Sequence, residues 1–174
     1  MDIRNAELEM IDISNKNIGK IDFSKRCLSG ANLSRGTFNE TVFTRADLSG
    51  ADLSRARVEA VDFSGAELTD ATLRGTVSEQ TDFSDADLSK ADLSSATISE
   101  TTFESADLSD ATLRGATLSD VDLSEVKLDG TDLSGADLSG LDLRDTDLSE
   151  ANFEDADLSG ADLTDADLTG ARCT

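Results

Sequence analysis

The 174-residue sequence contains no proline, tryptophan, tyrosine or histidine. Average globular domains use all four residue types, so an ordinary mixed core is not expected. Without histidine the chain also lacks the commonest general base. No serine therefore has the partner that usually activates it as a nucleophile.

Long apolar runs are missing as well. No stretch approaches the roughly 18 apolar residues that a membrane-spanning helix needs. The first ten residues, MDIRNAELEM, lack the basic and then apolar blocks of a secretory signal. We therefore expect a cytoplasmic protein that makes no membrane contact.

Basic residues are scarce, since 15 Lys and Arg oppose 37 Asp and Glu and give a formal charge of −22. Aromatic residues make up only 4% of the chain. High net charge with few aromatics is typical of disordered proteins. Whether this chain folds is therefore decided by where its apolar residues lie.

The apolar residues follow a five-residue repeat that keeps one phase from Met1 to the last residue, as in TDFSD at 81–85 and ADLSG at 136–140. Of the 35 third positions, 21 are Leu and seven are Phe, and 19 first positions are Ala. Each pentad thus offers two sites that can point inward. An α-helix would spread such a repeat around its whole cylinder, and a long strand would flip the face at every repeat. The chain must therefore turn within each pentad, where Ser followed by Gly or Asp supplies turn-forming residues.

Four turns close a square coil of 20 residues, and such coils stack at about 4.8 Å with parallel hydrogen bonding. The sequence tests this closure, because five phenylalanines recur every 20 residues and are expected to form a stacked structural core: Phe23, Phe43, Phe63, Phe83 and Phe103. The first residues of these pentads and of the next two in the series also avoid Ala. We name the four sides by their third positions, which recur in steps of 20: wall A from Phe23 to Leu163, wall B from Leu8 to Leu168, wall C from Ile13 to Cys173 and wall D from Ile18 to Leu158.

These repeats resemble the pentapeptide-repeat family, whose motif is A(D/N)LXX with a central Leu or Phe, and the resemblance covers essentially all of the chain. It implies a right-handed quadrilateral parallel β-helix, a hand that agrees with the preference of parallel crossovers. We expect one all-β domain over residues 1–174, with four pentapeptides per coil, about 8–9 coils and no loop insertions.

The two ends depart from the motif. Lys16 and Arg26 occupy positions that should point inward, so residues 1–30 are expected to form irregular coils or a polar cap, with a basic binding site as the alternative. The last repeat, GARCT, would leave an open strand edge. Either a homodimer forms there through the C-terminal coil, or the chain belongs to something longer.

Three other residues stand out within the repeat. Ser78 replaces a central Leu and is interpreted as a tolerated defect or a local bulge. Cys27 and Cys173 would lie about seven coils apart, far beyond the roughly 7 Å between Cα atoms that a disulfide allows. Because the carboxylates are expected on an open surface without a pocket, we expect no enzyme, no cofactor and no dedicated metal site.

The acidic charge is concentrated in the C-terminal two thirds. Residues 1–57 carry nine basic and eight acidic side chains, whereas residues 58–174 carry six basic and 29 acidic ones. Ten of these acids fall on wall A and nine on wall B, against only Lys90, Lys127 and Arg144 as basic residues. The candidate protein-binding residues are Asp62, Asp82, Asp85, Glu104, Asp122, Glu125, Asp142, Asp145, Asp162 and Asp165 on wall A, and Glu67, Asp70, Asp87, Asp107, Asp110, Asp147, Glu150 and Asp167 on wall B.

Two functions remain open from the sequence. The first is a non-catalytic solenoid that presents its acidic surface for protein binding or scaffolding, and its excess of Asp together with more Arg than Lys resembles the surface of halophilic proteins. The alternative comes from the family resemblance: some members mimic DNA and bind DNA gyrase, a type II topoisomerase, to inhibit it or protect it from quinolones. The acidic rod would carry roughly 0.8 charge per Å, against about 0.6 for duplex DNA. However, this sequence lacks the projecting loops and C-terminal helix of many topoisomerase-protecting members. Direct nucleic-acid binding is not expected, because this surface repels phosphate.

Overall fold

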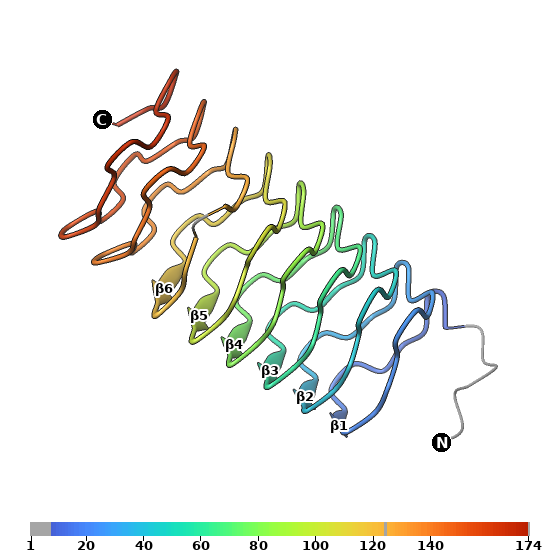
Figure 1. The fold of residues 1–174 in the computed structure, drawn as a ribbon. Coiled ribbons are helices and arrows are strands. Elements are labelled where there is room, and N and C mark those ends of the chain that lie inside the picture. The colour runs from blue at the N-terminus through green and yellow to red at the C-terminus, as the bar shows by residue number, and fades with distance from the viewer. Residues whose placement is uncertain (1–7, 124, 174) are drawn as a thin grey trace.

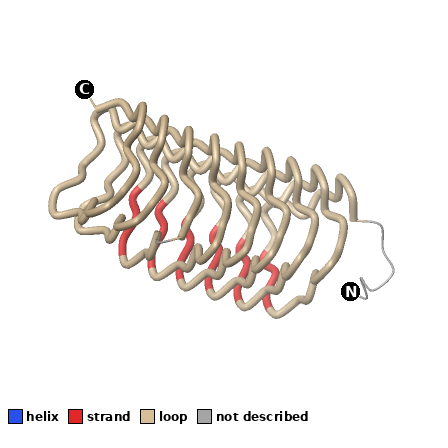
Figure 2. Tube along the Cα trace, turned by 45° about the horizontal axis from the view of Figure 1, so that its top comes forward, coloured by secondary structure: helices blue, strands red, loops and turns tan. Residues whose placement is uncertain are grey.

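The computed structural model describes residues 8–123 and 125–173 and forms a single elongated stack of coils (Figure 1). The regular strands of the described residues all lie on wall D: β1 (Asn17–Gly19), β2 (Thr37–Asn39), β3 (Arg57–Glu59), β4 (Val77–Glu79), β5 (Thr97–Ser99) and β6 (Thr117–Ser119). They form one parallel sheet in sequence order, in which each residue pairs with the residue 20 positions later. The strands therefore follow one side of the stack, as Figure 2 shows.

The other walls pair through single parallel bridges at the second position of each pentad. Wall C has a continuous series in which the bridges link residues 12, 32, 52, 72, 92, 112, 132, 152 and 172. Each bridge uses two backbone hydrogen bonds, as where Leu33 N donates to Asp52 O (2.7 Å) and Asp52 N donates to Ala31 O (2.9 Å). The 20-residue coil predicted from the sequence is confirmed, and so is the all-β parallel β-helix, whose register no loop insertion interrupts over the described residues.

The corner at the end of each pentad is a tight turn on walls A, B and C. At one such corner, Ala31 N donates to Leu28 O (2.9 Å), and Gly30 between them has a φ of +65°. A φ of this value lies in the left-handed region, and glycine adopts that region without steric cost because it has no Cβ. Many corners nevertheless hold Asp, Lys or Arg there, as at Lys25 with a φ of 58°.

The core is a narrow column that first and third positions fill. From Leu28 to Phe153 the third-position side chains are buried, and the five phenylalanines of wall A stack with ring centroids 4.9 to 5.1 Å apart and planes within 9° of parallel. Burying a Leu or Phe side chain stabilises a fold by roughly 1.5–3 kcal/mol. The predicted phenylalanine column is confirmed.

The corner between walls D and A has two forms. From β1 to β6 it is open, and no backbone bond joins the residue after the corner to the third position of wall D within the described residues. After Gly140 and Gly160 it is closed, because Leu141 N donates to Leu138 O (3.3 Å) and Ala161 N donates to Leu158 O (3.1 Å). The open corners are followed by Ile, Thr or Val, whereas the two closed ones are followed by Leu141 and Ala161.

Residues 8–30 repeat the pattern of the later coils, with β1 and bridges at Asp12, Asp22 and Cys27. Lys16 is exposed and Arg26 is half-buried, although both hold first positions. Residues 1–7 of the segment 1–30, for which irregular coils or a polar cap were predicted, lie outside the described residues, so the cap stays a prediction. At the other end Leu168 is 41% exposed, because none of the described residues forms a further coil over it.

Ser78 causes no bulge. It pairs in register with Val58 and Ile98, its side chain is 3% exposed, and its hydroxyl lies 3.4 Å from Thr101 Oγ1. The serine is therefore a buried polar substitution whose hydroxyl has a partner. Across residues 8–123 and 125–173, no helix is long and apolar enough to span a bilayer.

Candidate protein-binding surface

Most second-position acids have a structural role. In wall A, Ser84 N donates to Asp82 Oδ1 (2.8 Å), and this bond holds the turn that follows. The same bond joins Asp62, Asp87, Asp107, Asp142, Asp147, Asp162 and Asp167 to the backbone N–H two residues later. Each carboxylate thus fixes a corner with one oxygen and points outward from the wall.

Asparagine makes the same bond elsewhere in the chain. Ser34 N donates to Asn32 Oδ1 (3.1 Å), and Glu154 N donates to Asn152 Oδ1 (3.1 Å). The turn therefore requires a side-chain oxygen at the second position and not a charge. The negative charge of the other second positions is an additional property of the surface.

Hydrogen bonds keep several of these carboxyls ionised. Desolvation alone would raise the pKa of Asp62, but the hydroxyl and N–H of Ser64 and the hydroxyl of Thr44 lower it below its usual value. The hydroxyl and N–H of Thr164 lower the pKa of Asp162 in the same way. The guanidinium of Arg144 lowers the pKa of Asp142 to about 2. These groups are negatively charged at neutral pH.

Carboxylates of one column lie directly above one another. Bridges pair Asp62 with Asp82 and Asp142 with Asp162 on wall A. On wall B they pair Glu67 with Asp87, Asp87 with Asp107 and Asp147 with Asp167. Parallel strands are about 4.8 Å apart, so adjacent carboxylates without a cation between them repel each other.

The remaining predicted acids lie at the edges of the walls. Asp85, Glu125, Asp145 and Asp165 form the corner between walls A and B, and Asp70, Asp110 and Glu150 form the next corner. All seven have positive φ values and exposed side chains. The structure therefore places the acids of walls A and B on one continuous angular surface around their shared corner.

Within residues 58–174, walls A and B carry three basic residues, and acids engage two of them. Lys127 Nζ lies 2.9 Å from Asp107 Oδ2, and Arg144 contacts both Asp142 and Asp162. Lys90 makes no ion pair with any residue that the structure describes. Among the residues that the structure describes on walls A and B, ion pairs thus engage only a minority of the carboxylates.

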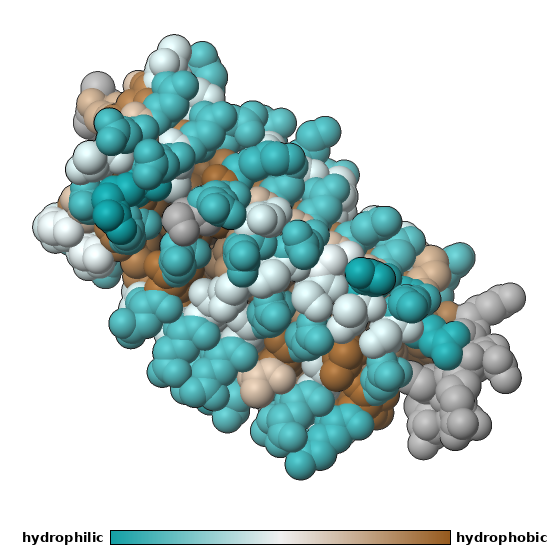
Figure 3. Space-filling view, in the orientation of Figure 1, coloured by the Kyte–Doolittle hydropathy of each residue, from teal (hydrophilic) through white to brown (hydrophobic). Residues whose placement is uncertain are grey.

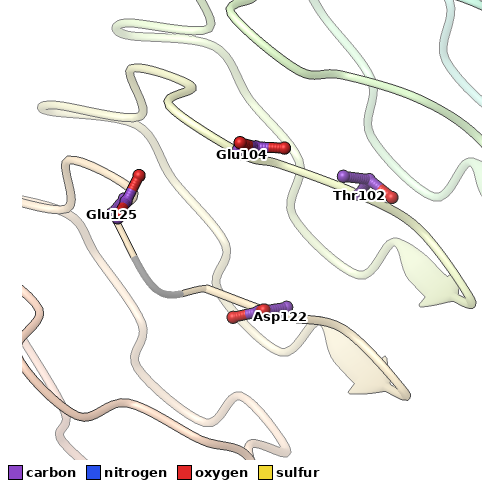
Figure 4. A pocket seen from close by; sticks show the side chains of 4 residues that line it. All are labelled: Thr102, Glu104, Asp122 and Glu125. Atoms are coloured by element: carbon purple, nitrogen blue, oxygen red, sulfur yellow. The ribbon is translucent and has the colours of Figure 1, made fainter.

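Wall A is hollowed where its regular pairing weakens. Figure 4 shows a groove between two neighbouring coils, with Thr102 and Glu104 on one side and Asp122 and Glu125 on the other. The groove is open to solvent and has a volume of about 230 Å³. Among the described residues, no three acidic or cysteine side chains are grouped to hold a metal ion.

Sequence reasoning left out two groups of this surface. Asp129 of wall B accepts a hydrogen bond from Ser109 Oγ (2.7 Å). It is an acid at the fourth position of a wall B pentad, and this position could have placed it among the candidate residues.

Cys27 occupies a second position of wall B, and its thiol donates to Glu9 Oε1 (3.3 Å) and Asp47 Oδ2 (3.4 Å). The N–H of Ser29 lowers the pKa of Cys27, but desolvation and the two carboxylates outweigh it and raise the pKa overall. Both cysteines are free, as the register predicted.

A family model described as pentapeptide repeats (8 copies) matches residues 27–65, 66–104, 101–140 and 136–172. Together these matches cover well over half of the chain. The chain belongs to the pentapeptide-repeat family. The match indicates a repeat scaffold and no catalytic family, and it agrees with the coil geometry above.

Two solved pentapeptide-repeat structures share this fold. HetL from the cyanobacterium Nostoc sp. strain PCC 7120, a protein involved in regulating heterocyst differentiation, is 27% identical over 93% of this chain and 86% of its own, with a TM-score of 0.57. Full-length QnrB1, a plasmid-mediated fluoroquinolone resistance protein, is 18% identical over 91% of this chain and 92% of its own, with a TM-score of 0.53. At that identity QnrB1 shows the fold alone. No curated protein sequence gives a significant match.

Proposed function

We propose that this pentapeptide-repeat protein is a cytoplasmic, non-catalytic scaffold that binds a basic surface of a partner protein through walls A and B. The observation that carries this proposal is the equivalence of Asn and Asp at the second position. Because Asn32 and Asn152 make the turn bond, folding does not require the carboxylate. Stacked carboxylates repel one another, so their accumulation on two walls is best explained by a cationic partner.

The charge distribution supports the same two walls as the binding surface. Wall C balances its acids with Arg74, Arg114 and Arg172, whereas walls A and B have few cations of their own. A positively charged partner would be steered to the corner between walls A and B, where Asp85, Asp145 and Asp165 are exposed. Such steering weakens as salt screens the charges.

The test compares two variants with equal charge loss. In the first, Asp82, Asp122, Asp142 and Asp162 of wall A become Asn; in the second, Asp52, Asp92 and Asp132 of wall C and Asp137 of wall D become Asn. The immobilised wild type is used to capture a partner, which is identified, purified and titrated against all three proteins. We expect the wall A variant to bind at least about tenfold more weakly and the second variant to bind like the wild type. An equal loss in both variants would show that only net charge matters.

A second candidate partner is DNA gyrase. The column of carboxylates at coil spacing has a linear charge density near that of duplex DNA, and QnrB1, which has this fold, is a fluoroquinolone resistance protein. By the family resemblance, Asp62, Asp82, Asp122, Asp142 and Asp162 would occupy the places of phosphates. A gyrase supercoiling assay with and without a quinolone tests this role. Inhibition or protection by the wild type, reduced in the wall A variant, would support it, and no effect at moderate salt would exclude it.

A further inference from the structure

Among the described residues, the bridges of wall A are interrupted at one place. Phe63 N donates to Asp82 O (2.7 Å) and Leu143 N donates to Asp162 O (2.9 Å), but Leu123 N makes no such bond to Asp142 O among the residues that the structure describes. The bridge series of this wall is also interrupted there, since it runs from residue 22 to residue 122 and resumes between residues 142 and 162.

Wall C, on the opposite side of the coil, is continuous at the same level. Leu113 N donates to Asp132 O (2.8 Å), and Leu133 N donates to Asn152 O (2.8 Å). Wall D is also paired, because Leu118 N donates to Asp137 O (3.1 Å). The stack is therefore closed on wall C and parted on wall A.

A change of corner form explains where the wall parts. The corner at Asp120 is open, with a φ of 53°, whereas the next corner at Gly140 is closed by the bond from Leu141 N to Leu138 O, with a φ of 72°. Coils with the same corner form can pair residue by residue, as the earlier coils do. At this step the two backbones leave the corner along different paths, so the pairing of wall A fails just after it.

The parted region is visible as a widened space between coils. In Figure 1 the coil after β6 lies farther from its neighbour than the earlier coils do, and in Figure 3 hydrophobic surface is visible beside β6. A groove there is lined by Ser119, Asp120, Val121, Asp122, Ser139, Gly140, Leu141 and Asp142. The groove of Figure 4 lies on the other side of Asp122. The wall A segment at Val121–Leu123 is thus bordered by grooves on both sides and is anchored through Val121 and Leu123, which are buried.

We propose that this junction is a hinge. Wall C is its continuous side and wall A its opening side, so residues 141–172 tilt relative to residues 8–119 and change the spacing of the carboxylates on wall A. The hinge follows from backbone geometry alone and does not depend on the function proposed above.

Amide hydrogen exchange of the purified full chain, resolved by NMR, tests the hinge directly. The amides of Leu123 and Asp142 should have protection factors at least about tenfold lower than those of Phe63 and Asp82, the equivalent positions in the regular part of wall A. The amides of Leu113 and Leu133 on wall C should be as protected as Leu73. Equal protection across wall A would overturn the proposal.

A corner exchange tests the cause. Gly140→Asp with Leu141→Val copies the Asp120–Val121 corner, and no atom lies within 4 Å of a Cβ at Gly140. The mismatch should then move one coil onward, so that Leu123 gains protection and Leu143 loses it, each by about tenfold. Gly135→Asp on wall C is the matched control, because its Cβ also has open space, and it should leave both values unchanged. A folded double variant with unaltered exchange would show that corner form does not set the hinge, and the wild-type measurement stands even if the variant fails to fold.

Discussion

The ring of Phe83 lies flat against that of Phe103, with 5.1 Å between the centroids and 9° between the planes. Phe103 is the last ring of the column, since Leu123 follows it on wall A. The ring stack therefore ends one coil before wall A parts. Up to that point the aromatic rings add an ordered contact between coils to the backbone ladder.

Removing one ring from the middle of the column should destabilise the whole stack. Phe63 is fully buried between Phe43 and Phe83, with centroids 5.0 and 4.9 Å away. Phe63→Ala should lower the free energy of unfolding by about 3–5 kcal/mol because it leaves a cavity. Phe63→Leu, which places the family's usual residue there, should cost about 1–1.5 kcal/mol. Urea denaturation measures both, and equal costs would contradict a specific role for the rings.

The turn bond of Asp82 can be separated from its charge. Asp82→Asn keeps an oxygen for the N–H of Ser84 and should leave the stability unchanged or slightly higher, because repulsion from Asp62 is relieved. Asp82→Ala removes the acceptor and should cost about 0.5–2 kcal/mol, as the loss of a helix N-cap does. Thermal and urea unfolding of the two variants give the comparison. If Asn destabilises as much as Ala, the charge itself is required for folding.

Acid should destabilise the protein because carboxyls such as Asp162, Asp167 and Asp142 have lowered pKa values in the folded state. A carboxyl with a depressed folded pKa contributes stability above its unfolded pKa of about 3.9, and this contribution is lost as the pH falls through the folded value. For Asp142 the folded value is about 2. The urea midpoint should thus fall between about pH 4 and pH 2. A midpoint that rises over this range would mean that relief of carboxylate repulsion is the larger effect.

Salt should stabilise the protein through walls A and B. Stacked pairs such as Glu67 with Asp87 and Asp147 with Asp167 repel each other, and the Debye length falls from about 10 Å at 0.1 M salt to about 3 Å at 1 M. The melting temperature should therefore rise steeply with KCl. The wall A Asn variant should show a weaker rise, and a flat response of the wild type would argue against a salt-adapted surface.

Much of this fold could be predicted from the sequence because the repeat never changes phase. The 20-residue spacing of Phe23 to Phe103 fixed the coil size, and the same register assigned the acids to their walls. Those assignments required only knowledge of the face of the coil on which each residue lies. The binding role of these acids stays a prediction, because a register places charges and does not identify what they meet.

The change of corner form after Asp120 could not be predicted in the same way. Asp120 and Gly140 both have a positive φ, so the fifth position alone does not distinguish an open corner from a closed one. Leu141 stands where Ile, Thr or Val follows the open corners, but this difference alone does not predict the bond from Leu141 N to Leu138 O. The interruption of wall A depends on how two neighbouring coils fit together, and the sequence of a single pentad does not predict that fit.

The continuous ladder of wall C also bears on how such a protein can change its length. Because every bridge joins residues 20 positions apart, the gain or loss of one 20-residue unit preserves all four faces and every neighbour relation. A change of five residues would rotate everything that follows by a quarter turn and move the acids to another side. The length of the stack can therefore change in steps of one coil, by duplication or loss of a 20-residue unit, while its cross-section stays the same.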